Sequence, residues 1–182
     1  MPQSSSFTVK AIGGRLRVLQ TQCRIAAAFD PAVQPLPTGS EFLAIWDTGA
    51  TNSVVTQKAI DACGLKQIGL AQVSGVGGTT TEPTYLVSIQ LPQGVGFNPV
   101  QVTRGILGHG SDVLIGMDII TMGDMVITNK NGTTIFSFCV PSIRQTDYVE
   151  EHNANLRQQQ HFGGMGGGKK RPKKHKTFGK HK

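Results

Sequence analysis

The chain has 182 residues, of which 38% are hydrophobic, only 16% are charged and 23 are glycines. This composition is typical of one turn-rich β domain with appendages, and it argues against a helical bundle. The formal net charge of +7 is confined to the last 14 residues, which hold seven Lys and one Arg, whereas residues 1–168 hold 10 basic and 11 acidic residues.

Three widely spaced cysteines, Cys23, Cys63 and Cys139, form no Cys-x-x-Cys pair. Their number and spacing argue against a disulfide framework and a cysteine-rich zinc site, and they predict reduced, mostly buried thiols. The N-terminus lacks the basic and apolar regions of a signal peptide, and no apolar run is long enough to span a bilayer. We therefore expect a cytoplasmic protein that uses no metal or cofactor and does not enter a membrane.

The first elements are predicted to be strands joined by loops. Residues 7–11 and 16–28 are rich in Val, Leu and Ile, and the glycines at 13 and 14 predict a hairpin between them. Residues 30–40 contain three prolines and predict a loop. Residues 42–46 are almost continuously apolar, which indicates a strand buried on both faces that delivers Asp47 to the interior.

Further short elements complete the predicted domain. Thr56 is a candidate N-cap for a short helix over residues 58–63, which Gly64 would end. A second short helix is predicted over residues 116–122. Strands are predicted over residues 67–74, 84–91, 97–107, 112–115, 125–128 and 133–140. A glycine-rich tip joins the first two of these strands, and an Asn-Gly pair predicts a hairpin between the last two. Many short strands with turns between them indicate an all-β, barrel-like domain.

Beyond residue 141 the chain changes character. Residues 144–160 are polar and glutamine-rich, and they predict a helix with a thin apolar stripe. A glycine linker and a like-charge run follow, and such a run is expected to be disordered alone. The sequence therefore predicts a domain over residues 1–141, a polar connector over residues 142–162, and a linker with a basic tail over residues 163–182.

Three short motifs point to the chemistry. They are Asp47-Thr48-Gly49-Ala50, Gly75-Val76-Gly77-Gly78 and Leu114-Ile115-Gly116. In the first, a strand ends in a carboxylate and turns sharply at a glycine, although Asp-x-Gly also occurs in ordinary turns. The three motifs together, in this order and at these intervals, resemble those of the retropepsin-like (retroviral-type) aspartic proteases over residues 7–141.

This resemblance implies a single-domain, all-β retropepsin-like barrel with one or two short helices, followed by a polar and basic tail. It implies that Asp47 is the catalytic residue and that Thr48, Gly49 and Ala50 support the active site. The glycine-rich motif at residues 75–78 would be the tip of a flap hairpin that binds substrate, and the motif at residues 114–116 would brace the catalytic loop by packing.

An aspartic protease needs two carboxylates that share one proton, and this chain has a single Asp-Thr-Gly sequence. Asp118 and Asp124 do not repeat the pattern. We therefore expect a two-fold homodimer that brings two copies of Asp47 together, and an isolated chain that is inactive. Ala50 stands where many pepsin-like enzymes have a hydroxyl residue that stabilises the ionised carboxylate, which predicts activity extending towards neutral pH.

The expected function is that of a homodimeric aspartic endopeptidase that hydrolyses peptide or protein substrates, in a bacterial single-domain member of the family. One alternative is a catalytically silent retropepsin-like module that dimerises or binds peptides. Another is a nucleic-acid-binding protein that acts through Lys169–Lys182, because such a cationic run binds polyanions with a steep salt dependence.

Overall fold

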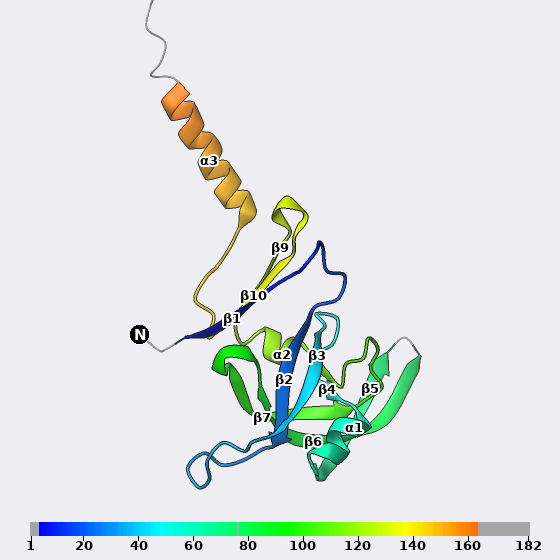
Figure 1. Cartoon of the computed structure of the whole chain (residues 1–182). Coiled ribbons are helices and arrows are strands. Elements are labelled where there is room, and N and C mark those ends of the chain that lie inside the picture. Colours follow the sequence, from blue (N-terminus) through cyan, green and yellow to red (C-terminus); the bar gives the residue numbers. More distant parts are fainter. Residues whose placement is uncertain (1–3, 76, 164–182) are drawn as a thin grey trace, which may run out of the picture. The chain divides into compact units, whose positions relative to one another are not determined.

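The computed structural model describes residues 4–75 and 77–163. The elements follow in the order β1 (Ser5–Lys10), β2 (Gln20–Ala27), β3 (Ser40–Trp46), β4 (Val54–Val55), α1 (Gln57–Ala62), β5 (Gln67–Gly75), β6 (Gly78–Gln90), β7 (Gly96–Arg104), β8 (Val113–Ile115), α2 (Met117–Ile120), β9 (Asp124–Thr128), β10 (Ile135–Val140) and α3 (Tyr148–Gly163) (Figure 1). Single 3₁₀ turns lie at Pro92–Gly94 and Lys130–Gly132. The chain divides into two compact units, Met1–Arg144 and Gln145–Lys182.

The larger sheet of the first unit has the strand order β2-β3-β8-β4-β7-β6-β5. An additional pairing joins β2 to β6, so that the strands from β2 to β6 in this order close on themselves. The two ladders that hold the middle of the sheet, β3 with β8 and β4 with β7, are parallel. The predicted all-β barrel is therefore confirmed. The short strands β8 and β4 lie in the middle of its strand order, next to β3, the strand that precedes Asp47.

The hairpin predicted across the glycines at 13 and 14 is wrong. Strand β1 pairs with β10 at the other end of the domain, whereas β2 pairs with β3 and β6. The physical reason is the burial of Phe7, which is 2% exposed and lies 5.8 Å, centroid to centroid, from the ring of Phe136. A local hairpin would not bring these rings together, so a long-range apolar contact overrides the local turn signal.

The second sheet has the order β1-β10-β9 and joins the two ends of the domain. Its rings from β1 and β10 pack against Trp46, the last residue of β3, whose ring centroid lies 5.0 Å from that of Phe136. The indole Nε1 of Trp46 donates a buried hydrogen bond of 3.0 Å to Thr21 Oγ1. Because these contacts fix the end of β3, they also fix the place from which Asp47 emerges.

Most other predicted elements are present with small shifts of their ends. Thr56 is the N-cap of α1 and accepts a hydrogen bond from the amide of Ala59, while Gly64 follows the helix with a φ of +57°. The β9–β10 hairpin is confirmed, and so is the proline-containing loop before β3. Three strands differ more clearly: β2 begins four residues later than predicted, at Gln20, β6 begins six residues earlier, at Gly78, and β7 ends three residues earlier, at Arg104.

All three cysteines are free, as predicted. Cys23 is buried, and burial raises the pKa of its thiol to about 12, while Cys63 and Cys139 are half-buried. Burial also raises the pKa of the Cys63 thiol, whose Sγ donates to the carbonyl of Ile25. The first two thiols are therefore poor nucleophiles at neutral pH, which fits a packing role.

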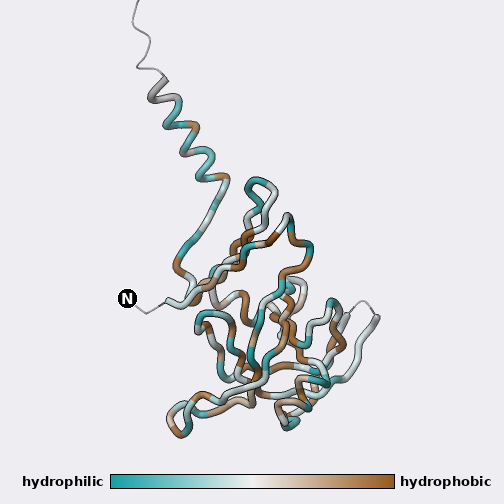
Figure 2. The backbone as a smooth tube through the Cα atoms, in the orientation of Figure 1, coloured by the Kyte–Doolittle hydropathy of each residue, from teal (hydrophilic) through white to brown (hydrophobic). Residues whose placement is uncertain are grey.

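The second unit contains the predicted polar helix. Asp147 begins α3 by accepting hydrogen bonds from the amides of Val149 and Glu150 through Oδ1. Figure 2 shows that most of α3 is hydrophilic, in contrast to the strands of the first unit. Among the described residues, none of the helices is both long and apolar enough to cross a membrane. The predicted basic tail, Lys169–Lys182, lies outside the described residues.

Candidate active site

Asp47 lies immediately after β3, at the point where the parallel ladder with β8 ends. Its amide donates a hydrogen bond of 3.0 Å to the carbonyl of Ile115, which continues the ladder by one residue. The chain then turns, and Asp47 Oδ1 accepts a hydrogen bond of 2.8 Å from the amide of Gly49. The carboxylate is exposed, so the expectation that the strand delivers it to the interior is wrong for the single chain. The strand is buried in alternation, and the turn carries Asp47 out of the core.

Gly116 lies directly against the backbone of the loop that carries Asp47. A Cβ atom at this position would lie 2.6 Å from the carbonyl carbon and 2.7 Å from the carbonyl oxygen of Asn52, distances that real Cβ atoms essentially never show. The carbonyl of Ala50 also accepts a hydrogen bond of 2.8 Å from the amide of Met117. The third motif therefore lies against the first, with Gly116 at the contact and the buried Ile115 beside it.

Asp118, which does not repeat the Asp-Thr-Gly pattern, holds the later part of this loop, at Thr51 and Ser53. Asp118 Oδ2 accepts from the amide of Ser53 at 2.9 Å, and its Oδ1 accepts from the Ser53 hydroxyl at 2.8 Å. The same hydroxyl oxygen accepts from the amide of Gly116 at 3.1 Å, and the amide of Asp118 donates to the carbonyl of Thr51 at 3.1 Å. Asp118 is thus a positioning residue for the loop.

The signal for a supporting carboxylate is Ser53, although the sequence does not show which side chain is its partner. Ser53 directly precedes the apolar pair of β4 and is fully buried, and a buried hydroxyl almost always has a hydrogen-bond partner. The sequence assigns Asp118 no catalytic role, because it does not begin a second Asp-Thr-Gly. The absence of a repeated motif excluded a second catalytic carboxylate in the chain, but it did not exclude a supporting one.

The glycine-rich motif forms the tip of the β5–β6 hairpin. The two strands pair in register up to Gly75 and Gly78, and Ser74 Oγ lies 3.0 Å from Thr79 Oγ1 across the hairpin. Val76, named with the tip in the sequence prediction, lies outside the described residues. The described glycines of the tip are exposed, and a Cβ atom on any of them would meet nothing within 4 Å.

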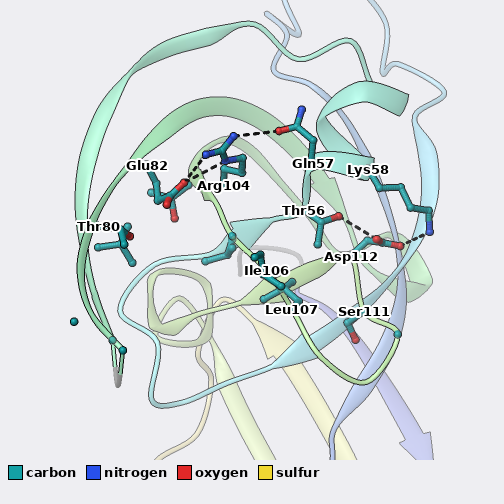
Figure 3. A pocket seen from close by; sticks show the side chains of 18 residues that line it. Thr56, Gln57, Lys58, Thr80, Glu82, Arg104, Ile106, Leu107, Ser111 and Asp112 are labelled. Carbon is teal, nitrogen blue, oxygen red and sulfur yellow. Dashed lines mark hydrogen bonds and ion pairs between the residues drawn. The ribbon is translucent and has the colours of Figure 1, made fainter.

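A cavity of about 1150 Å³ lies between this hairpin and the chain that follows β7 (Figure 3). Its walls combine the inner side of the hairpin, the start of β4 and α1, and the loop before β8. Apolar lining comes from Val54, Val73, Ile106 and Leu107. Asp47 is not among the described residues that line this cavity.

Two ion pairs lie in the walls of the cavity, each between two of its lining residues. Arg104 Nη2 lies 3.1 Å from Glu82 Oε2, and Lys58 Nζ lies 2.6 Å from Asp112 Oδ2. Figure 3 shows them on separate sides of the space. Asp112 also accepts a hydrogen bond of 3.0 Å from Thr56 Oγ1, so that the N-cap residue of α1 holds this carboxylate as well. Sequence reasoning identified none of the four charged residues, because they are far apart in the chain and belong to no motif.

Thr48 is exposed and Ala50 is half-buried. The amide of Ala50 donates to the carbonyl of Asp47 at 3.3 Å, so these residues form a tight turn around the carboxylate. Within the described part of the chain, no group of three or more His, Cys, Asp or Glu side chains is arranged to hold a metal ion.

Part of the chain that includes these segments matches a known protein family. Residues 37–119 match the family model described as aspartyl protease, and the match covers the loop of Asp47, the β5–β6 hairpin and the Gly116 support. This part of the chain is therefore similar to the aspartyl proteases. No curated protein matches the sequence.

Several solved structures are distantly similar to the chain. A retropepsin-like aspartic protease from Rickettsia conorii is 16% identical, with 77% of this chain and 98% of that chain covered and a TM-score of 0.45. EIAV protease in complex with an inhibitor is 18% identical, with coverages of 57% and 86% and a TM-score of 0.42. A retroviral protease-like domain from Leishmania major is 18% identical, with coverages of 67% and 95% and a TM-score of 0.39.

Proposed function

We propose that the protein is a homodimeric aspartic endopeptidase in which each chain contributes one Asp47. The observation that supports this proposal is an exposed carboxylate that a tight turn holds in place, in a domain that also has a large cavity under the β5–β6 hairpin. An acid–base mechanism with water requires a second carboxylate close to the first, and within one chain Asp118 is engaged with Ser53. A second copy of the chain supplies the missing carboxylate by symmetry.

In this mechanism one Asp47 carboxylate is ionised and the other is protonated. The ionised carboxylate takes a proton from a water molecule held between the two, and the protonated one donates a hydrogen bond to the carbonyl oxygen of the scissile peptide. Water attacks the carbonyl carbon, and the resulting tetrahedral species collapses when the leaving nitrogen receives a proton from the pair. The tight turn and the bond from Gly49 hold each carboxylate in one orientation before substrate arrives.

The substrate is proposed to be an extended peptide that lies under the β5–β6 hairpin. Here the hairpin would act as the flap, with its exposed glycine amides close to the peptide backbone. Thr48, also exposed, would then meet its symmetry mate across the dimer axis.

The test is cleavage of a diverse peptide pool by the wild type and by Asp47→Asn from acidic to neutral pH, read by mass spectrometry. We expect cleavage by the wild type and a loss of about 10³-fold or more in the variant, because general acid–base catalysis by the pair is removed. Asp61→Asn, an exposed carboxylate on α1, is the matched control and should retain full activity.

A mixing experiment tests the shared site. Added Asp47→Asn protein should lower the activity of a fixed amount of wild type, because mixed dimers hold only one intact carboxylate. A monomeric enzyme would be unaffected by the added variant. Absence of Asp47-dependent cleavage at every pH, in a sample shown to be dimeric by light scattering, would refute the endopeptidase and favour a peptide-binding module.

A further inference from the structure

We propose that Arg104 is a specificity-determining residue that selects substrates with an acidic side chain in the cavity under the β5–β6 hairpin. This inference rests on the proposed endopeptidase function and names a substrate class for it. It starts from the way in which the two ion pairs of the cavity present their charges.

In each pair the carboxylate is the more enclosed partner. The side chains of Glu82 and Arg104 are 21% and 44% exposed, and those of Asp112 and Lys58 are 14% and 73% exposed. The charge presented to an incoming ligand is therefore the cation. Lys58 makes one charged contact through a freely rotating ammonium group, whereas Arg104 is held at several points. Only the guanidinium is a preorganised donor.

The hydrogen bonds of Arg104 leave several N–H groups of its guanidinium available to a ligand. Nε donates to Glu82 Oε2 at 3.1 Å, and Nη2 lies 3.1 Å from the same oxygen, so Glu82 occupies the edge formed by Nε and Nη2. Nη1 donates to Gln57 Oε1 in a long bond of 3.5 Å. The two hydrogen bonds with the described residues use two of the five N–H groups. The remaining N–H groups, on Nη1 and Nη2, suit a carboxylate, which guanidinium groups bind in a paired, coplanar manner.

The position of Arg104 suits the recognition of a peptide side chain. It is the last residue of β7, and the cavity extends from it to the glycines of the hairpin tip. Figure 3 shows Arg104 and Glu82 on one side of the space, with Ile106 and Leu107 near its middle. A bound peptide would thus place apolar side chains against Ile106 and Leu107 and an acidic side chain against Arg104.

The experiment exchanges the two charges and leaves the ion pair in place. The double variant Glu82→Arg with Arg104→Glu keeps a pair of opposite charges but presents the acid from the position of Arg104. Cleavage profiling with matched peptides that carry Glu, Gln or Lys at each position should show a preference for Glu of about tenfold in kcat/KM for the wild type, as one added charged hydrogen-bonded pair predicts. The preference should move to Lys in the double variant.

Two further variants keep the test decisive. Arg104→Gln should lose the preference for Glu while its kcat/KM for the Gln peptide stays within a few-fold of the wild type. The matched control is Arg24→Glu with Glu41→Arg, an exchange in an exposed ion pair outside the cavity, which should leave the profile unchanged. A purely structural role for Arg104 would change the rates for all three peptides alike.

The failures of the two proposals are distinguishable. If the wild type shows no Asp47-dependent cleavage, the proposed function and this inference both fail. If Asp47-dependent cleavage occurs without enrichment of Asp or Glu at any position, or with a preference for Lys or Arg, the endopeptidase stands and the assignment of Arg104 is overturned. An unchanged preference for Glu in the double variant overturns it as well.

Discussion

The loop of Asp47 and the tip of the β5–β6 hairpin both depend on glycine, but for opposite reasons. Gly116 is needed because the loop backbone lies where a side chain would be, with Asn52 2.6 Å from an added Cβ atom. Gly75, Gly77 and Gly78 have open space around that position. The loop is held by hydrogen bonds from α2 and β8, whereas the described bonds of the tip come from the hairpin itself.

This difference is what the proposed aspartic protease site would require. A carboxylate that must meet a second carboxylate needs a fixed position, because a misplacement of about 1 Å can cost a large part of the rate. A hairpin that admits substrate needs freedom from the body of the domain. Substitutions in each region test this difference.

The largest effect on folding is expected from Gly116→Ala. The added methyl group would meet backbone atoms, which cannot rotate away, so we expect a loss of about 3 kcal/mol or more in the free energy of unfolding, measured in urea. Peptidase activity should fall as well, since the loop must move. Gly77→Ala, with open space around the new methyl group, is the control and should change stability by no more than about 0.5 kcal/mol. Equal losses in both variants would contradict the comparison.

A smaller effect is expected from Asp118→Asn. The amide group of Asn keeps one acceptor, so the bonds from the amide and the hydroxyl of Ser53 cannot both be kept, and the cost should be about 1–3 kcal/mol. Ser53→Ala should cost a similar amount. Because both residues belong to one network, the double variant should lose clearly less than the sum of the two single losses. Additive losses would show that Asp118 does not act through Ser53.

The smallest effect is expected from Asp124→Asn. Like Asp118, Asp124 accepts hydrogen bonds from a hydroxyl and from backbone amides, but these contacts lie at the surface. The Ser142 hydroxyl, followed by the amides of Ile143 and Arg144, donates to Asp124 and holds the pKa of its carboxyl below the ordinary value. A lowered pKa in the folded state means that the ionised form stabilises the fold. This contribution is present above the unfolded-state pKa of about 3.9 and is lost as the pH falls through the folded-state pKa.

The measurement for Asp124 is the free energy of unfolding of wild type and Asp124→Asn at pH 7, 5 and 3. The wild type should be more stable at pH 7, and the difference should shrink as the pH approaches 3. A difference that stays constant over this range would show that the charge of Asp124 does not contribute. Asp61→Asn, an exposed carboxylate bonded only to Gln57 among the described residues, provides the control.

Local sequence signals predicted much of the fold. The N-cap at Thr56, the Asn-Gly turn between β9 and β10 and the apolar run of β3 each act over a few residues, and each produced the expected element. The pairing of β1 was missed because it depends on Phe7 meeting rings from the far end of the domain. The positions of Arg104 and Glu82 were missed for the same reason, since ion pairs between separate strands leave no pattern along the chain.

By itself, the sequence determined the kind of carboxylate loop, the order of its three motifs and the all-β character of the domain. These properties follow from backbone preferences and from the period of apolar residues, which are local. Tertiary structure alone decided that Asp47 is exposed, that Asp118 holds Ser53 and that Arg104 presents a cation to the cavity. Burial, hydrogen-bond geometry and charge exposure depend on which distant segments meet, and the core fixes these contacts only when the whole domain has folded.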